Sequence, residues 1–183
     1  HSETLWLMGA KELWLQGDVD GGRGMLERAF KENPNSEEIW LAAVKIESEN
    51  SQFSRARALL AKAREQAGTK RVWLKSAQLE RSQGNVEAEK KILEEGIHKF
   101  PTFDKFYLML GQLAERIADP SARAIYREGT VRCVKSATIW IWASRYEEKH
   151  SAAKARSLLE KARVKNPKND LLWLESIRVE VRD

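Results

Sequence analysis

The chain is poor in the residues that staple small proteins or bind metals. Among its 183 residues it has one cysteine, Cys133, and three histidines, His1, His98 and His150, which are far apart in the sequence. A single cysteine cannot close an intramolecular disulfide, and no Cys/His set has the spacing of a metal site. We therefore expect no metal and no cofactor. The low cysteine content favours a reducing compartment, either the cytosol or the nucleus.

Long apolar runs and catalytic groupings are also missing. No run approaches the roughly 20 apolar residues that span a bilayer, so no membrane association is expected. No nucleophile–base set and no paired carboxylates stand out, which predicts a protein that is not an enzyme. The glycine-rich stretch "GDVDGGRG" (17–24) lacks both the Gly-Lys-Ser/Thr ending of a phosphate loop and the final Glu of a calcium loop. It is interpreted as a turn followed by a weak start of the second helix. The net charge of +5 permits acidic proteins or nucleic acids as partners without requiring them.

The chain does contain a regular repeat. An aromatic residue followed by an apolar one recurs six times, with spacings of 34, 33, 33, 34 and 33 residues. The six aromatic residues are Trp6, Trp40, Trp73, Phe106, Trp140 and Trp173. A fixed period of this length is typical of stacked helix–turn–helix repeats. Because these residues recur once per repeat on an apolar face, we expect them to form the structural core between successive helices.

Each period contains two helical segments separated by a short turn rich in Gly, Asn, Asp or Pro. Such a repeat cannot bury its apolar face alone, so its neighbours must complete the core. The predicted fold is therefore all-α, an α-solenoid with a right-handed superhelical path. We expect one array over residues 1–183, cut from a longer protein. Its predicted repeats are 3–36, 37–69, 70–102, 103–136 and 137–169, with a half repeat at 170–183.

A glutamate stands seven residues after several of the aromatics, at Glu47, Glu80, Glu147 and Glu180. A basic residue follows early in the second helix of the same repeat. The predicted ion pairs are Glu47 with Arg57, Glu80 with Lys90 and Glu147 with Arg156. We expect them to tie the two helices of one repeat together.

The period and the small residues of the second helix resemble tetratricopeptide repeats. The small residues are Ala56, Ala63, Ala122, Ala155 and Ala162. The Trp–Glu spacing, with second helices such as "RGMLERAFKENP" and "ARSLLEKARVKNP", more specifically resembles the half-a-tetratricopeptide (HAT) repeat. In wording the chain is most similar to the HAT proteins of the U5 small nuclear ribonucleoprotein (snRNP). That resemblance implies a nuclear, non-catalytic scaffold in pre-mRNA splicing. Its partners would be spliceosomal proteins of the U5 and U4/U6 particles, bridged during tri-snRNP assembly.

Two features of the first helices are candidates for partner binding. Five residues after the aromatics stand Lys11, Lys45, Arg145 and Arg178, with Gln78 and Gly111 in the other two repeats. By analogy with related solenoids this helix face lines a groove, where four cations would grip an acidic peptide or phosphates. Trp142, two residues after Trp140, occupies a position of variable polarity and is a candidate anchor; local packing is the competing interpretation.

Direct RNA binding and a scaffold role in another machine, such as pre-mRNA cleavage or ribosome biogenesis, stay open as alternatives. No exposed aromatics alternate with the basic residues, which favours protein partners over RNA.

Overall fold

The computed structural model describes residues 3–181, and over that range the chain folds into eleven α-helices without a strand. The helices are α1 (Glu3–Leu15), α2 (Val19–Glu32), α3 (Glu37–Glu49), α4 (Phe53–Gln66), α5 (Lys70–Ser82), α6 (Val86–Lys99), α7 (Asp104–Arg116), α8 (Ala122–Arg132), α9 (Ala137–Glu148), α10 (Ala152–Lys165) and α11 (Asp170–Val181). The predicted all-α repeat fold is confirmed. Residues 1–2 and 182–183 of the predicted array lie outside the described residues. None of the described helices is long and apolar enough to cross a membrane.

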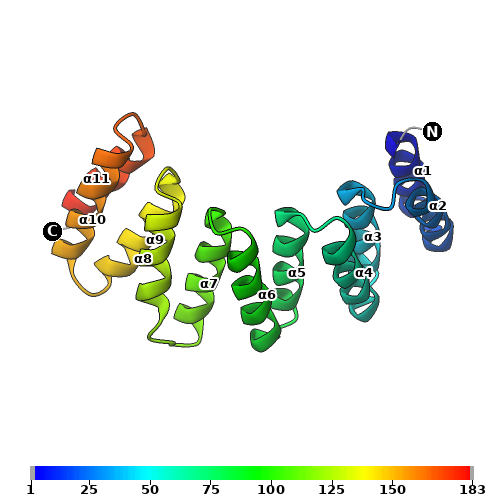
Figure 1. Cartoon of the computed structure of the whole chain (residues 1–183), viewed down its shortest axis with the longest axis horizontal. Helices are drawn as coiled ribbons and strands as arrows, with labels where there is room; N and C mark the ends of the chain where they lie inside the picture. The colour runs from blue at the N-terminus through cyan, green and yellow to red at the C-terminus, as the bar shows by residue number, and fades with distance from the viewer. Residues whose placement is uncertain (1–2, 182–183) are drawn as a thin grey trace. The chain divides into compact units, whose positions relative to one another are not determined.

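The helices group into two compact units, residues 1–85 with α1 to α5 and residues 86–183 with α6 to α11. Within each unit consecutive helices are joined by short turns and lie side by side in chain order (Figure 1). First helices of neighbouring repeats also touch, α1 with α3, α7 with α9 and α9 with α11. The division between the units falls within the predicted repeat 70–102.

The turn inside four of the repeats has the same backbone design. One residue takes a positive φ, at Gly17, Ser51, Gly84 and Ala118. The next residue's N–H then donates to a carbonyl five residues earlier, as from Asp18 to Leu13 at 2.9 Å and from Gln52 to Glu47 at 2.8 Å. This is the Schellman motif, which satisfies the last carbonyls of a helix and reverses the chain. The interpretation of "GDVDGGRG" as a turn followed by the start of a helix is confirmed: Gly17 and Asp18 lie in the turn, and α2 begins at Val19.

Small residues let the second helices approach their neighbours. The alanines expected at close contacts, Ala56, Ala63, Ala122, Ala155 and Ala162, all have no exposed surface. Gly129 belongs to the same series as Ala63 and Ala162. A Cβ there would lie 2.8 Å from Ile139 and 2.9 Å from Tyr107. The close approach therefore fixes the residue size at these positions.

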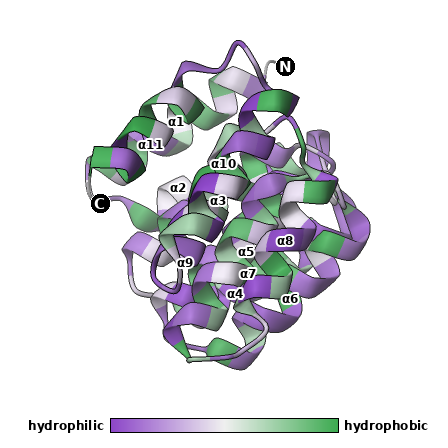
Figure 2. Ribbon diagram, turned by 90° about the vertical axis from the view of Figure 1, so that its left-hand side faces the viewer, coloured by the Kyte–Doolittle hydropathy of each residue, from purple (hydrophilic) through white to green (hydrophobic). Residues whose placement is uncertain are grey.

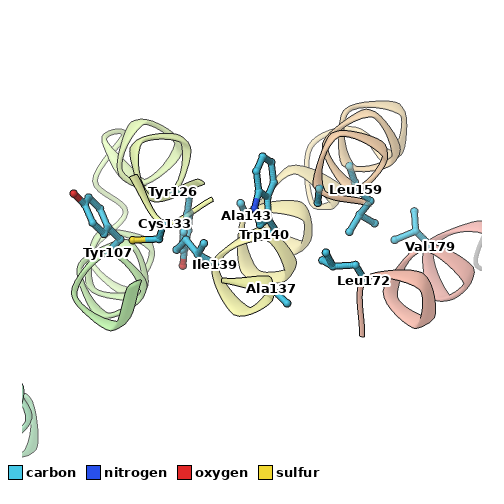
Figure 3. Close-up of a cluster of buried hydrophobic side chains, with 12 residues drawn as sticks. Tyr107, Tyr126, Cys133, Ala137, Ile139, Trp140, Ala143, Leu159, Leu172 and Val179 are labelled. Carbon is cyan, nitrogen blue, oxygen red and sulfur yellow. The ribbon is translucent and has the colours of Figure 1, made fainter. Parts of the chain in front are cut away.

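Most of the recurring aromatics are buried, as expected for a repeat core. Trp40, Trp73 and Trp140 expose 7 to 9% of their surface and Phe106 none. Figure 3 shows Trp140 within the core of the second unit, near Ile139 and Ala143 and between α8 and α10.

The indole N–H of Trp40 donates to the Pro34 carbonyl at 2.8 Å, and that of Trp140 donates to the Val134 carbonyl at 2.9 Å. A buried aromatic thus also holds the turn six residues before it. In the fourth repeat this bond comes from Tyr107, whose hydroxyl donates to the Pro101 carbonyl at 2.9 Å. Tyr107 and not Phe106 therefore occupies the repeat position. The aromatic spacings become 34, 33, 34, 33 and 33 residues. The residue five positions after the aromatic in α7 is then Gln112 and not Gly111.

The two terminal members of the aromatic series differ from the predicted core. Trp6 is only partly buried, and Trp173 is 48% exposed. Arg163 of α10 covers one face of the Trp173 ring, with its guanidinium carbon 4.5 Å from the ring centroid. No described helix packs on the other side of α11. Its ribbon alternates between apolar and polar residues (Figure 2), and Leu171, Leu174 and Ile177 are exposed.

Candidate protein-interaction surface

The recurring glutamate does form an ion pair, but its arginine comes from the preceding repeat. Glu47 of α3 accepts two 2.8 Å hydrogen bonds from Nε and Nη2 of Arg23 in α2. The predicted partner, Arg57, lies one repeat too late. Further pairs between a second helix and the following repeat are Arg57 with Glu80, Lys90 with Asp119, Arg123 with Glu147 and Arg156 with Glu180. Because each second helix packs on the next first helix, these pairs join successive repeats, and the intra-repeat prediction is wrong.

In one ion pair the second helix carries the acid and the next first helix carries the base. Glu89 of α6 is completely buried and accepts a 2.5 Å hydrogen bond from Arg116 of α7. At this position α4, α8 and α10 carry the buried alanines Ala56, Ala122 and Ala155. In the next first helix Ala114 stands where other repeats carry the glutamate. The acid has therefore moved to the second helix and the base to the first.

The cations predicted five residues after the aromatics form a row, here called the ladder. Its two N-terminal members remain accessible. Lys11 of α1 is exposed, and within residues 3–181 it makes no ion pair. The Lys45 ammonium lies 5.5 Å from the centroid of the Trp14 ring and 3.8 Å from Glu49, with 60% of its side chain exposed. These two lysines form the open part of the first-helix face together with Trp14, an aromatic outside the repeat frame that the sequence analysis did not select.

The two C-terminal cations of the ladder are bound to acids of their own chain. Arg145 of α9 donates to both carboxylate oxygens of Glu175 in α11, at 2.7 and 3.0 Å. Arg178 donates to Glu175 at 3.0 Å and to Glu148 at 3.1 Å. Burial opposes ionisation of Glu175, but these hydrogen bonds outweigh it and hold the pKa of its carboxyl below the ordinary value. Arg145 and Arg178 thus connect α9 to α11 through hydrogen bonds to Glu175 and Glu148.

Trp142 is half-buried and packs against the hydrophobic core of the second unit. Its ring therefore contributes to local packing. Its role as a partner anchor stays a prediction.

Two clefts lie where successive second helices meet the first helix between them. One cleft of about 370 Å³ is formed by α2, α3 and α4. Another of about 330 Å³ is formed by α8, α9 and α10. The sequence analysis placed binding on the first helices only. The residues that line these clefts carry no motif, so periodicity alone did not identify them.

Nothing in the described range resembles a reactive centre. Residues 3–181 contain no group of three or more His, Cys, Asp or Glu side chains that could hold a metal ion. Burial raises the pKa of the Cys133 thiol to about 11, which keeps it protonated at neutral pH and unreactive.

Sequence comparisons connect the chain to splicing factors. Residues 13–79 match the family model of the tetratricopeptide repeat. The chain is 46% identical over 138 residues to pre-mRNA-splicing factor prp1 of Schizosaccharomyces pombe, covering 75% of this chain and 15% of that protein. It is 31% identical over 120 residues to pre-mRNA-splicing factor 6 of Saccharomyces cerevisiae, covering 63% and 13%. Protein STABILIZED1 of Arabidopsis thaliana is 65% identical over 51 residues, 28% of this chain and 5% of that protein. The chain thus spans only about one seventh or less of these relatives.

Comparison of structures supports the same fold. The MamA protein has a TM-score of 0.60 at 18% identity, covering 91% of this chain and 92% of that one. A thermophilic tetratricopeptide-repeat protein of Thermus thermophilus has a TM-score of 0.58 at 16% identity, covering 98% and 100%. At these identities the similarity establishes the fold alone. Together with the sequence matches, it shows a tetratricopeptide-repeat fold in a chain homologous to the Prp1/Prp6 pre-mRNA-splicing factors, with the family model itself matching residues 13–79.

Proposed function

We propose that this chain is part of a non-catalytic interaction scaffold in pre-mRNA splicing, acting in the nucleus. Its partners would be spliceosomal proteins of the U5 and U4/U6 particles, held together during tri-snRNP assembly. The observation that carries the proposal is the 46% identity with a pre-mRNA-splicing factor over 138 residues, which reaches across most of the repeats.

The surface of the chain is consistent with binding instead of catalysis. Its periodic features, the buried aromatics and the ion pairs between repeats, hold the helices in register. The side chains left accessible, such as Lys11 and Lys45, offer charge and contact area but no nucleophile. Stacked repeats of this kind present extended binding surfaces.

The direct test is a pull-down from nuclear extract with the 183-residue chain as bait, with and without RNase. Recovery of U5 and U4/U6 proteins that survives RNase supports the bridging scaffold. Loss of all recovery after RNase would make RNA the ligand or tether. Recovery of cleavage or nucleolar factors in place of splicing proteins would contradict the splicing assignment and keep the scaffold role.

A charge-reversal variant tests the open part of the first-helix face. Lys11→Glu with Lys45→Glu changes two exposed side chains, so the helical content should not change. Arg145 and Arg178 are unsuitable for this test, because reversing them would place like charges beside Glu175 or Glu148. Unchanged recovery of partners with the lysine variant would remove this face from consideration.

A further inference from the structure

The two second-helix clefts occupy the same position in the repeat. Each is formed by two successive second helices and the first helix between them, α2–α3–α4 and α8–α9–α10. Each residue that lines the first cleft has a counterpart 99 or 100 positions later in the second cleft, which is three repeat periods. The corresponding pairs include Leu26 with Tyr126, Glu27 with Arg127, Phe30 with Thr130, Ile46 with Tyr146 and Arg55 with Lys154. The shared register makes the first cleft a natural reference for the second.

The floors of the clefts differ in polarity. The first is lined by Leu26, Phe30 and Ile46. The second has Tyr126 and Tyr146, with ring centroids 5.6 Å apart. Figure 3 shows Tyr126 together with Ala143, another residue of this floor, in the second unit. The second cleft therefore combines an aromatic floor with polar surroundings.

The charge of the rims differs more strongly. In the first cleft two cations, Arg23 and Arg55, are matched by two acids, Glu27 and Glu47. The second cleft has four cations and one acid: Arg123, Arg127, Lys154 and Lys161, with Glu147. Among these, Arg123 is bound to Glu147 with Nε 2.8 Å from Oε1.

The remaining cations, Arg127, Lys154 and Lys161, are exposed, and within residues 3–181 their side chains make no ion pair or hydrogen bond. The position of Arg127 is taken by the acid Glu27 in the first cleft, so the repeat does not require a cation there. Such a cleft attracts and orients negative charge.

We propose that the cleft between α8 and α10 is a docking site for an acidic segment of a partner protein. Carboxylates of that segment would pair with Arg127, Lys154 and Lys161, and an apolar or aromatic side chain would occupy the space of about 330 Å³ above the tyrosines. The basic surface continues across α8, where a second hollow is lined by Arg123, Arg127 and the 70% exposed Val131. An extended segment could follow it.

The geometry favours a peptide over RNA. Single-stranded RNA binding requires aromatic rings on which bases can stack. Tyr126 is only 1% exposed, and its hydroxyl donates to Glu115 at 2.6 Å. Tyr146 is half-buried between Tyr126 and His150. Neither ring offers an open face of the required size.

The test uses a random dodecapeptide library displayed on phage and selected against the 183-residue chain. Enriched peptides are expected to be acidic and to contain an aromatic or apolar residue. Their affinity should fall about tenfold in Arg127→Glu with Lys154→Glu, because attraction becomes repulsion. Arg55→Glu with Lys62→Glu makes the same charge change on α4, at the positions that correspond to Lys154 and Lys161. This control should bind within about twofold of the original chain at equal salt.

Several outcomes would overturn the proposal. They are failure to enrich any peptide that depends on the cleft, equal losses in the two charge-reversed variants, and displacement of the peptides by a 12-nucleotide single-stranded RNA that binds more tightly. Circular dichroism checks the fold, and Arg127→Gln with Lys154→Gln provides a milder version of the same change.

The docking site rests on the proposed scaffold function only for the identity of its partner, and the two can fail separately. Nuclear pull-downs are repeated with Arg127→Glu/Lys154→Glu. If both chains recover the same splicing proteins in equal amounts, the cleft proposal is wrong and the scaffold remains. If cleft-dependent acidic peptides are selected but no splicing protein is recovered, the scaffold assignment is wrong and the cleft remains.

Discussion

At the scale of single residues, the recurring aromatic contributes differently to stability in different repeats. Trp40 is 7% exposed, stacks near Phe30 with ring centroids 4.4 Å apart, and donates to a turn carbonyl. Trp173 is 48% exposed, and its N–H lies 3.4 Å from its carbonyl partner. The same side chain is therefore core in one repeat and partly surface in another.

We expect Trp40→Ala to lower the free energy of unfolding by about 3–5 kcal/mol, as for a buried large aromatic. Trp173→Ala should cost less, about 1–2 kcal/mol, because about half of its surface stays in contact with water. Chemical denaturation of both variants measures the difference. Equal losses would contradict the burial difference, and a Trp40→Ala loss below about 1 kcal/mol would contradict the core assignment.

Two helical glycines give a matched pair for steric constraint. A Cβ on Gly111 of α7 would lie 2.5 Å from the Tyr126 ring, whereas a Cβ on Gly24 of α2 meets no atom within 4 Å. We expect Gly111→Ala to destabilise by about 1–3 kcal/mol through overpacking. Gly24→Ala should stabilise by up to about 1 kcal/mol through helix propensity. Thermal melting compares them, and stabilisation by both substitutions would refute the close contact.

At the scale of helices, the ion pairs set the register between successive repeats. Glu47 and Glu80 tie a first helix to the second helix before it and expose only 6% and 5% of their surface, whereas Glu180 is exposed. Desolvation offsets much of the attraction in such pairs, so their main effect is on geometry. The reversed pair of Glu89 and Arg116 shows that either helix can supply the acid.

The reversed pair predicts an asymmetric response to mutation. Arg116→Ala should destabilise by about 3 kcal/mol, because it leaves the fully buried Glu89 without its cation. Glu89→Ala should remain within about 1 kcal/mol of the original chain, because alanine fits this position in α4, α8 and α10 and Arg116 can turn to solvent. Adding Arg116→Ala to Glu89→Ala should then cost little. Urea denaturation of the three variants forms the cycle, and equal costs for the two single variants would contradict it.

At the scale of the whole molecule, each helix contacts near neighbours in the chain. Stability in such a stack is approximately a sum of repeat and nearest-neighbour terms. The division into residues 1–85 and 86–183 agrees with this, since each unit has its own core clusters.

Hydrogen exchange should therefore report local effects. Gly111→Ala is expected to lower amide protection most in α7, α8 and α9 and to leave α1 to α3 nearly unchanged. Mass spectrometry of exchanged peptides measures this directly. A uniform loss of protection along the chain would mean that the molecule opens as one cooperative body.

The repeat period, the helix pairs and the small residues of the second helices were predictable from the sequence. They recur locally, and helix periodicity and turn chemistry act over a few residues: Trp40 and its Pro34 turn are six positions apart. The frame slipped only where two adjacent aromatics, Phe106 and Tyr107, compete for one position. There the hydrogen bond to Pro101 selects Tyr107.

The tertiary structure alone decided which groups meet between repeats. Arg57 lies nearer to Glu47 in the sequence than Arg23 does, and only the packing of α2 on α3 selects Arg23 as its partner. Arg145 looked free in the sequence because its acid, Glu175, lies 30 residues away. The basic cleft arises in the same way: Arg127 and Lys154 come from separate helices, and the packing of α8 and α10 on α9 brings them to one surface.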